Sequence, residues 1–137
     1  MQTRKFFGLP NMDEDTGLVK LTFEDRGEYL YVRATGMHTD HATADRSLTV
    51  IAAKCKELGS TKLLIYRDIT QVIEIAAMFQ VASRLPQELP GVRTAFVNPH
   101  SSNRNNLEFG REIIAKTGAE IGLFSDEPSA IEWLLAP

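Results

Sequence analysis

The sequence predicts an α/β domain: a mixed sheet of about five strands with four helices, in the order ββαβαβαβα. Two stretches of alternating apolar and polar residues, 18–24 and 29–34, flank a short turn that contains glycine. Such a pattern is typical of a β-hairpin. Further along, short apolar runs alternate with longer stretches of helical periodicity. That alternation favours parallel strands joined by right-handed helical crossovers. Because a hairpin precedes parallel strands, the sheet is expected to be mixed.

The composition is that of one soluble globular domain. Of the 137 residues, 43% are apolar and 24% are charged, which is enough to bury one core. The net charge of -3 and the lack of a basic block argue against nucleic acid as a partner. The single Cys55 excludes an internal disulfide and fits a reducing compartment. No apolar run approaches the ~20 residues of a membrane-spanning helix. We therefore expect a cytoplasmic protein without a transmembrane segment.

Residues 1–17 are expected to form an N-terminal arm or loop, and residues 18–137 the single domain. The end of the arm is polar and acidic and has no apolar periodicity, which is typical of loops. Phe6 and Phe7 within the arm are large enough to dock on the domain.

The first helix is expected between Gly36, which ends the hairpin, and Gly59, which acts as a stop signal. Thr39 or Asp40 can cap it, because their side-chain oxygens accept a hydrogen bond from a free backbone N–H. Apolar residues at helical spacing predict its buried face: Ala44, Leu48, Ile51, Ala52, Cys55 and Leu58.

The centre of the chain predicts a buried strand, a short turn and a long helix. The apolar run 63–66 ends just before Asp68, and a helical apolar pattern runs from Thr70 to Pro86. Asp68 and Gln71 stand three residues apart before this pattern, which resembles a loose capping box. In open α/β sheets, the carboxyl end of such a strand is where ligands and partners most often bind.

The rest of the chain repeats this alternation. Strands are expected at 91–97 and 120–124, a helix at 107–117, and a last helix capped by Ser125 or Asp126.

The helix after Asp68 is apolar on two sides. The face expected to meet the sheet carries Val72, Ile75, Ala76, Phe79 and Ala82. A second ridge, formed by Ile73, Ala77 and Val81 and flanked by Arg84, has no reason to face solvent. This ridge predicts an interface with a protein partner or with a second copy of the chain. Two alternatives remain open: a loop or the N-terminal arm covers it, or an apolar ligand lies beneath the helix.

Several segments resemble the STAS family, and more closely its SpoIIAA-like group of short bacterial proteins. They are the strand Tyr29–Val32 before Gly36, the strand 62–65 followed by Asp68, the strand Arg93–Val97, and Phe124–Glu127 with Ala130 and Trp133-Leu134. The resemblance spans about residues 18 to 135. It implies a small α/β protein that acts by binding rather than by catalysis.

The resemblance also implies a candidate phosphorylation switch. In phosphoregulated STAS proteins, an Asp, then hydroxyl residues and a Gly, follow the third strand, and phosphorylation of one hydroxyl breaks the complex. Alignment of Asp68 with that Asp places Thr70 at the phosphoacceptor position. This sequence has Ile69 in place of the other hydroxyl and Gln71 in place of the Gly. The competing interpretation is that Thr70 is a plain helix cap.

The start of the first helix offers candidate metal ligands. His38, Asp40, His41 and Asp45 gather there, and the last two stand one helical turn apart. Their spacing matches no established ligand motif, and residues at a helix start usually act as caps and solvated charges. No metal site is predicted.

An enzyme would need polar residues that converge on a cleft. The set available at strand ends is Asp68, Arg67, Thr70 and His100. The sequence shows no nucleophile and base pair among them, so we predict no catalytic residue, no cofactor and no enzymatic activity.

The main prediction is therefore a non-enzymatic STAS-like binding protein that contacts a partner, or itself, through the helix after Asp68. The first alternative is a carrier of a lipid or another small apolar ligand. Its pocket would be lined by Ile75, Phe79, Phe109 or Trp133. The second alternative is the phosphorylation switch at Thr70.

Overall fold

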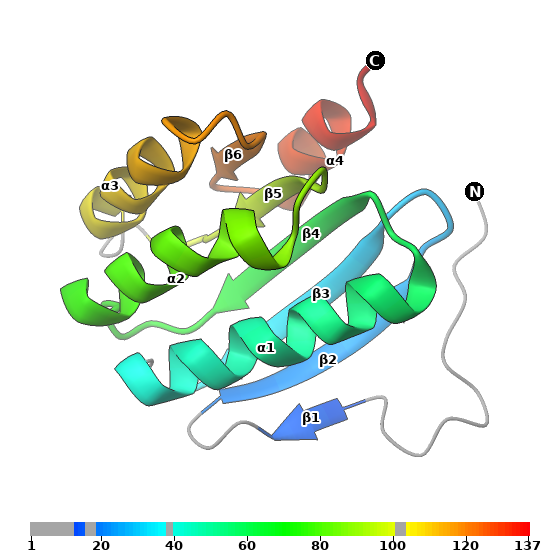
Figure 1. Ribbon diagram of the computed structural model, residues 1–137. Coiled ribbons are helices and arrows are strands. Elements are labelled where there is room, and N and C mark those ends of the chain that lie inside the picture. Colours follow the sequence, from blue (N-terminus) through cyan, green and yellow to red (C-terminus); the bar gives the residue numbers. More distant parts are fainter. Residues whose placement is uncertain (1–12, 16–18, 38–39, 101–103) are drawn as a thin grey trace.

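The computed structural model describes residues 13–15, 19–37, 40–100 and 104–137. Its strands are β1 (Asp13–Asp15), β2 (Val19–Asp25), β3 (Leu30–Gly36), β4 (Lys62–Asp68), β5 (Arg93–Val97) and β6 (Ile121–Phe124). Its helices are α1 (His41–Leu58), α2 (Ile75–Glu88), α3 (Arg104–Ala115) and α4 (Glu127–Leu135). Figure 1 shows α1, α2 and α3 side by side on one face of the sheet and α4 on the other. No helix in these ranges is long and apolar enough to cross a membrane.

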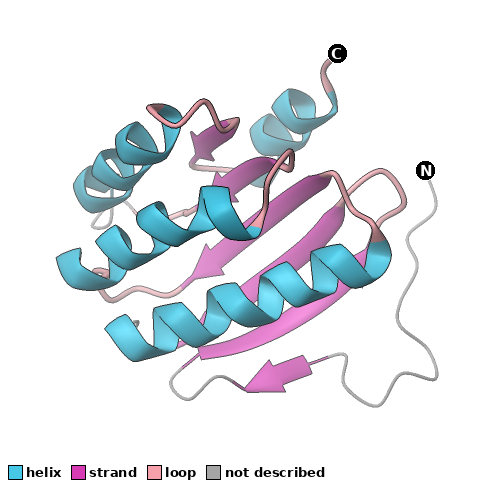
Figure 2. Ribbon diagram, viewed as in Figure 1, coloured by secondary structure: helices cyan, strands magenta, loops and turns pink. Residues whose placement is uncertain are grey.

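The strands lie in the sheet in the same order as in the chain, from β1 to β6. β1, β2 and β3 pair antiparallel, whereas β3, β4, β5 and β6 pair parallel (Figure 2). The predicted mixed α/β sheet, with a hairpin followed by helical crossovers, is confirmed. Each parallel crossover leads to the adjacent strand, so α1, α2 and α3 all cover the same face.

The short strand β1 was not expected, because it falls in the segment 1–17 that was predicted to be an arm or loop. Asp13 pairs with Thr22 and Asp15 with Lys20, in antiparallel register along the edge of the sheet. Pairing at an edge uses backbone N–H and C=O groups, so it left no apolar alternation in the sequence. The rest of the predicted arm, with Phe6 and Phe7, lies outside the described residues.

Helix α1 has the ends that the sequence predicts. The Asp40 carboxylate accepts a hydrogen bond from the backbone N–H of Thr43 at 2.7 Å, which satisfies one of the free N–H groups of the first turn. Gly59 ends the helix in a left-handed conformation, with φ 64°, which glycine adopts without strain. Thr39, the other predicted cap, lies outside the described residues.

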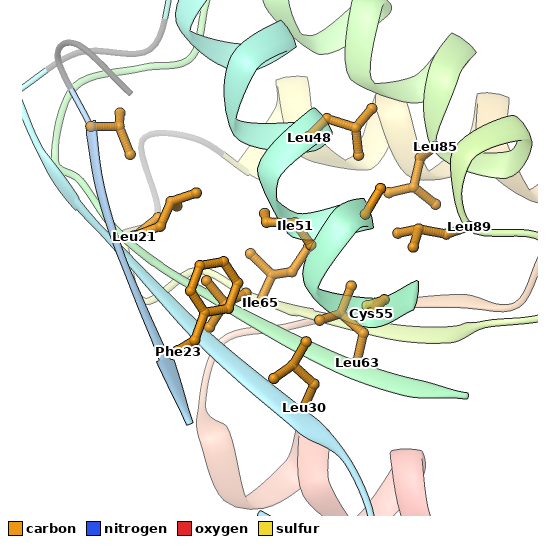
Figure 3. Packing of buried hydrophobic residues seen from close by; sticks show 14 of the residues in the cluster. Leu21, Phe23, Leu30, Leu48, Ile51, Cys55, Leu63, Ile65, Leu85 and Leu89 are labelled. Carbon is orange, nitrogen blue, oxygen red and sulfur yellow. The ribbon is translucent and has the colours of Figure 1, made fainter. Parts of the chain in front are cut away.

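Two apolar clusters hold the layers together. The larger cluster lies between the sheet and α1 to α3, as Figure 3 shows for Phe23, Ile51 and Ile65. The smaller cluster lies under α4 and contains Tyr29, Tyr31, Leu64, Ala95, Val97, Ala130 and Leu134. Alternate residues of β4 enter opposite clusters, because successive side chains of a strand point to opposite faces.

Helix α2 begins later and ends later than predicted. Residues 69–74 form a loop, and the helix starts at Ile75 after Glu74, whose side chain makes no capping hydrogen bond. The expected capping box at Asp68 and the cap at Thr70 are therefore wrong. Ile69 and Ile73 are buried and anchor the loop to the core, so the chain becomes helical only after them. The helix also continues through Pro86, which was expected to end it.

Helix α4 is anchored to the sheet by Arg93 and Trp133. The Arg93 guanidinium lies 4.2 Å from the centre of the Trp133 ring and donates a 2.8 Å hydrogen bond to the Trp133 carbonyl. Phe124 packs against the same ring, with 5.5 Å between ring centres. At the start of the helix, Asp126 accepts a hydrogen bond from the backbone N–H of Ser129 at 2.8 Å, as the sequence predicts.

Candidate functional site

Asp68 ends strand β4 and lies between two basic side chains. Its Oδ2 accepts a 2.6 Å hydrogen bond from Arg33 Nη2, and its Oδ1 lies 3.0 Å from His100 Nε2. Arg33 comes from β3, and its guanidinium also lies 5.0 Å from the centre of the Tyr66 ring. The three side chains meet at the carboxyl ends of neighbouring strands.

The two neighbours fix the charge of this carboxylate. The hydrogen bond from His100 is the main cause that holds the pKa of Asp68 below its usual range, and the hydrogen bond from Arg33 is the second. In turn, the hydrogen bond to Asp68 raises the pKa of the Arg33 guanidinium. Asp68 is thus an ionised hydrogen-bond acceptor at neutral pH that joins two segments. Because both of its oxygens have partners within the protein, it is poorly suited to act as a general base.

Of the four polar residues considered for a catalytic site, the structure brings together Asp68 and His100. Arg67 points to the opposite face of the sheet, where it is buried and donates to the carbonyls of Ile69 and Gln71 at 3.2 and 3.3 Å. Burial lowers the pKa of Arg67 to about 10. Thr70 is exposed on the loop between β4 and α2. The set therefore does not converge on one cleft.

Arg33 is the member of this cluster that sequence reasoning missed. In the parallel register of β3 and β4, Thr35 lies opposite Asp68 and Arg33 lies opposite Tyr66. Because the side-chain period of a strand is two, Arg33 and Asp68 share a face. Knowing the register in which β3 and β4 pair would have been enough to find the pair.

The predicted apolar ridge of the central helix is part of the core. Ile73 is 4% exposed and Ala77 is 0% exposed, and both pack in a cluster with Met78. Val81 is partly buried against the same cluster. The prediction that these residues form an interface with a partner or a second copy is therefore wrong, because they pack inside the domain. The reason is that α2 lies between α1 and α3 and needs a buried face toward each neighbour.

Arg84, the fourth predicted interface residue, contacts the domain itself. Its guanidinium forms an ion pair with Asp45 of α1 and a 3.0 Å ion pair with Glu88 one turn further along α2. Gln80 adds a 2.9 Å hydrogen bond to the same Asp45 carboxylate. Arg84 thus ties α2 to α1.

Most of the face of this segment that was expected to meet the sheet is instead exposed, and of its five residues only Ala82 is buried in the main cluster. Val72, Ile75 and Phe79 are 45%, 54% and 56% exposed. Phe109 of the neighbouring helix α3 is 45% exposed. We call these four residues the α2–α3 apolar surface.

Helices α2 and α3 pack closely beneath this surface. A Cβ added at Gly110 would lie only 2.5 Å from the end of the Met78 side chain, so the absence of a side chain at this position allows the close approach. Asn106 donates a 2.9 Å hydrogen bond to the Ile73 carbonyl and joins the start of α3 to the loop before α2. Phe109 and Phe79 are the chain neighbours of Gly110 and Met78, so the exposed rings flank one contact.

The residues proposed for an apolar ligand pocket do not line a common cavity. Ile75, Phe79 and Phe109 are exposed on α2 and α3, whereas Trp133 packs on the opposite face of the sheet. An apolar cavity of about 70 Å³ does lie between α1, α2 and the sheet. Pockets for small ligands are several times larger, at about 300 Å³ or more. That predicted pocket is therefore wrong.

The residues weighed as metal ligands have other partners. Asp40 caps α1, His41 Nε2 lies 3.1 Å from Gln80 Oε1, and Asp45 pairs with Arg84. His38 lies outside the described residues. Within the described ranges, no three His, Cys, Asp or Glu side chains are grouped to hold a metal ion.

The sheet order and helix placement define a STAS fold of the SpoIIAA-like kind. Among solved structures, the chain is similar to that of the anti-sigma factor antagonist SpoIIAA in its unphosphorylated form. The TM-score is 0.52 and the sequence identity 17%, over 85% of this chain and 99% of that chain. This confirms the predicted STAS-like fold. No protein-family model matches the chain, and no curated protein matches its sequence.

Proposed function

We propose that this protein is a non-enzymatic regulatory protein that binds a second, different protein through the α2–α3 apolar surface. Support comes first from the fold, because the similar SpoIIAA is named as an antagonist of an anti-sigma factor, which describes an effect on another protein. The predicted cytoplasmic location is part of the proposal and fits the reduced Cys55.

The observation that carries the proposal is the exposure of large apolar side chains on two adjacent helices. Ile75 and Phe79 are more than half exposed, and Phe109 adds an aromatic ring from the neighbouring helix. Single exposed apolar residues are ordinary, but a group of them marks a contact surface. Aromatic residues are also enriched where binding free energy concentrates.

The charges around this surface favour a different protein over a second copy of the chain. Glu112 lies one turn after Phe109 and is exposed. In a two-fold dimer the same surface meets itself, so the Glu112 carboxylates of the two copies would approach one another, which is unfavourable. We therefore infer a partner with an apolar centre and a basic rim.

The test begins with site-specific photo-crosslinking in native cells. A photoreactive amino acid is placed at Phe79 or, as a control, at exposed Glu132 on α4, on the opposite face of the sheet. A partner captured from Phe79 and not from Glu132 is identified by mass spectrometry and purified. Its affinity is then measured by calorimetry.

The variants Ile75→Ser and Phe79→Ser should each weaken that purified complex by about tenfold or more. Glu132→Ala should leave it unchanged, and all three variants should keep the wild-type melting temperature within a few degrees. Unchanged affinity in both serine variants would contradict the proposal. Crosslinks from Phe79 to another copy of this chain alone would show a homodimer interface instead.

A second candidate function is control of this binding by phosphorylation of Thr70. Thr70 is exposed on the loop between the Asp68 cluster and Val72, the first residue of the α2–α3 apolar surface. A phosphate there would add about two negative charges beside the proposed contact. Thr70→Glu should then weaken the purified complex, and Thr70→Val should not. Intact mass of the protein from native cells would reveal the modification, and its absence under all growth conditions would count against this candidate.

A further inference from the structure

An apolar cavity lies between α1, α2 and the sheet. Its volume is about 70 Å³. Its wall comes from β2, β3, β4, β5, both helices and the loop between β4 and α2. Leu21, Leu48 and Ile65, which Figure 3 labels, belong to three of these elements. The cavity is separate from the α2–α3 apolar surface, because none of the four residues of that surface lines it.

The cavity is larger than the voids that close packing normally leaves. Protein interiors pack as densely as organic crystals and contain few voids larger than one water molecule. One water needs only ~10–15 Å³, whereas this cavity measures about 70 Å³. Side chains that face an empty space lose dispersion contacts with the atoms that would fill it. A cavity of this size therefore favours an occupant.

The wall of the cavity favours a nonpolar occupant. Of the described residues that line it, Ser47 and Arg67 are polar, and both have partners in the protein. The Arg67 guanidinium donates to the carbonyls of Ile69 and Gln71 at 3.2 and 3.3 Å. The other described lining residues are all apolar. A buried water needs about two to four polar partners, and apolar cavities without them stay dry. Water is therefore a poor occupant.

The volume limits the occupant to a very small molecule. Because one water takes up ~30 Å³ in the liquid, about 70 Å³ holds a molecule of roughly two or three non-hydrogen atoms. A lipid or a drug-sized ligand is excluded. We propose that this cavity binds a small nonpolar molecule, either a short hydrocarbon or a dissolved gas. The occupant would contact Ile69 and Ile73, which anchor the loop before α2. This inference does not depend on the proposed protein partner.

The proposal is tested by nuclear magnetic resonance with full-length protein that carries ¹³C-labelled methyl groups. Xenon and cyclopropane are dissolved separately at increasing pressure, with helium at the same pressures as the reference. We expect saturable shifts of the methyl signals of Leu21, Ile65 and Ile73, which line the cavity. The methyl signals of Leu134, under α4, should not show them. Saturation with either probe supports the proposal. No saturation with both, or equal shifts at Leu134, would overturn it.

Two alanine-to-valine variants assign the binding to this cavity. Ala34→Val enlarges a lining residue of β3, so it should weaken xenon binding by about tenfold or more and should not lower the melting temperature. Ala52→Val makes the same change at a buried residue of α1 that does not line the cavity. It should leave xenon binding unchanged and lower the melting temperature, because overpacking is destabilising. If Ala34→Val does not fold, Ala44→Val, which fills the cavity from α1, takes its place. A cavity-filling variant that binds xenon as tightly as the wild type would overturn the proposal.

Discussion

Arg33 and Asp68 stand 35 residues apart in the sequence, yet a 2.6 Å hydrogen bond joins their side chains across strands β3 and β4. On the other side of Asp68, His100 extends the contact to the segment after β5. One carboxylate therefore links three consecutive parallel strands at their carboxyl ends. The loop that leads from β4 to α2 begins directly after this point.

Replacing Asp68 should change how stability depends on pH. Because folding lowers the pKa of Asp68, its contribution is complete above the unfolded pKa of about 4 and is lost as pH falls through the folded value. Asp68→Asn should lower the free energy of unfolding at pH 7 by about 0.5–1 kcal/mol, since the pair is partly exposed. Urea unfolding at pH 7 and pH 3 should show the difference from wild type shrinking in acid. Glu132→Gln is the control, and a difference that stays constant would rule out this role.

Two aspartate substitutions, two residues apart, distinguish the buried side of the α2 segment from its exposed side. Ile73→Asp places a charge in the core and should lower the free energy of unfolding by about 3 kcal/mol or more. Ile75→Asp lies on the exposed face and should cost less than about 1 kcal/mol. Chemical denaturation followed by circular dichroism measures both. Similar losses in the two variants would mean that the burial described for this segment is wrong.

The close packing of α2 against α3 predicts that the effect of one substitution on stability depends on the residue at position 78. Gly110→Ala brings a Cβ within 3 Å of the Met78 side chain. Overpacking costs about 1–3 kcal/mol, and the gain in helix propensity over glycine is about 1 kcal/mol. The variant should therefore be destabilised by about 1 kcal/mol in the wild-type background. In a Met78→Ala background the same change should become stabilising. Thermal unfolding is measured for the wild type, the two single variants and the double variant. If the stability changes of the single variants add up to that of the double variant, the contact between positions 78 and 110 is excluded.

Cys55 should be unreactive while the protein is folded. Burial raises the pKa of its thiol to about 11, so only about a thousandth of it would be thiolate at pH 8. Labelling with a disulfide reagent at pH 8 should follow the unfolding rate and should become immediate in 6–8 M urea, a strongly denaturing range. Fast labelling in buffer alone would show that α1 opens on its own.

The parts of the fold that the sequence predicts well are those in which a single pattern governs a segment. Helix α1 has one apolar face between Asp40 and Gly59, and both its face and its ends match the expectation. The strands β2 to β6 likewise stand where alternation or a short apolar run placed them. Interactions between residues close in the sequence are sufficient to predict these elements.

Helix α2 shows where such reasoning stops. Its segment carries apolar residues on two sides, and periodicity does not say which side faces the core. Neighbouring helices decide this: α1 and α3 both pack on α2, and the small Gly110 lets Met78 approach α3. Ile73 belongs to the loop, yet it packs in the same cluster as Ala77 and Val81, so the grouping of these residues was right and the error was in which face was taken to meet the sheet.

The sequential strand order has a consequence for synthesis on the ribosome. Each new strand of the sheet can pair at once with the strand made before it, so the face covered by α1, α2 and α3 closes progressively as the chain emerges. The opposite face of the sheet is covered later. Leu64, Ala95 and Val97 lose contact with water only when α4, which follows all six strands in the sequence, packs against them. During synthesis this second face is therefore the surface that a chaperone would meet.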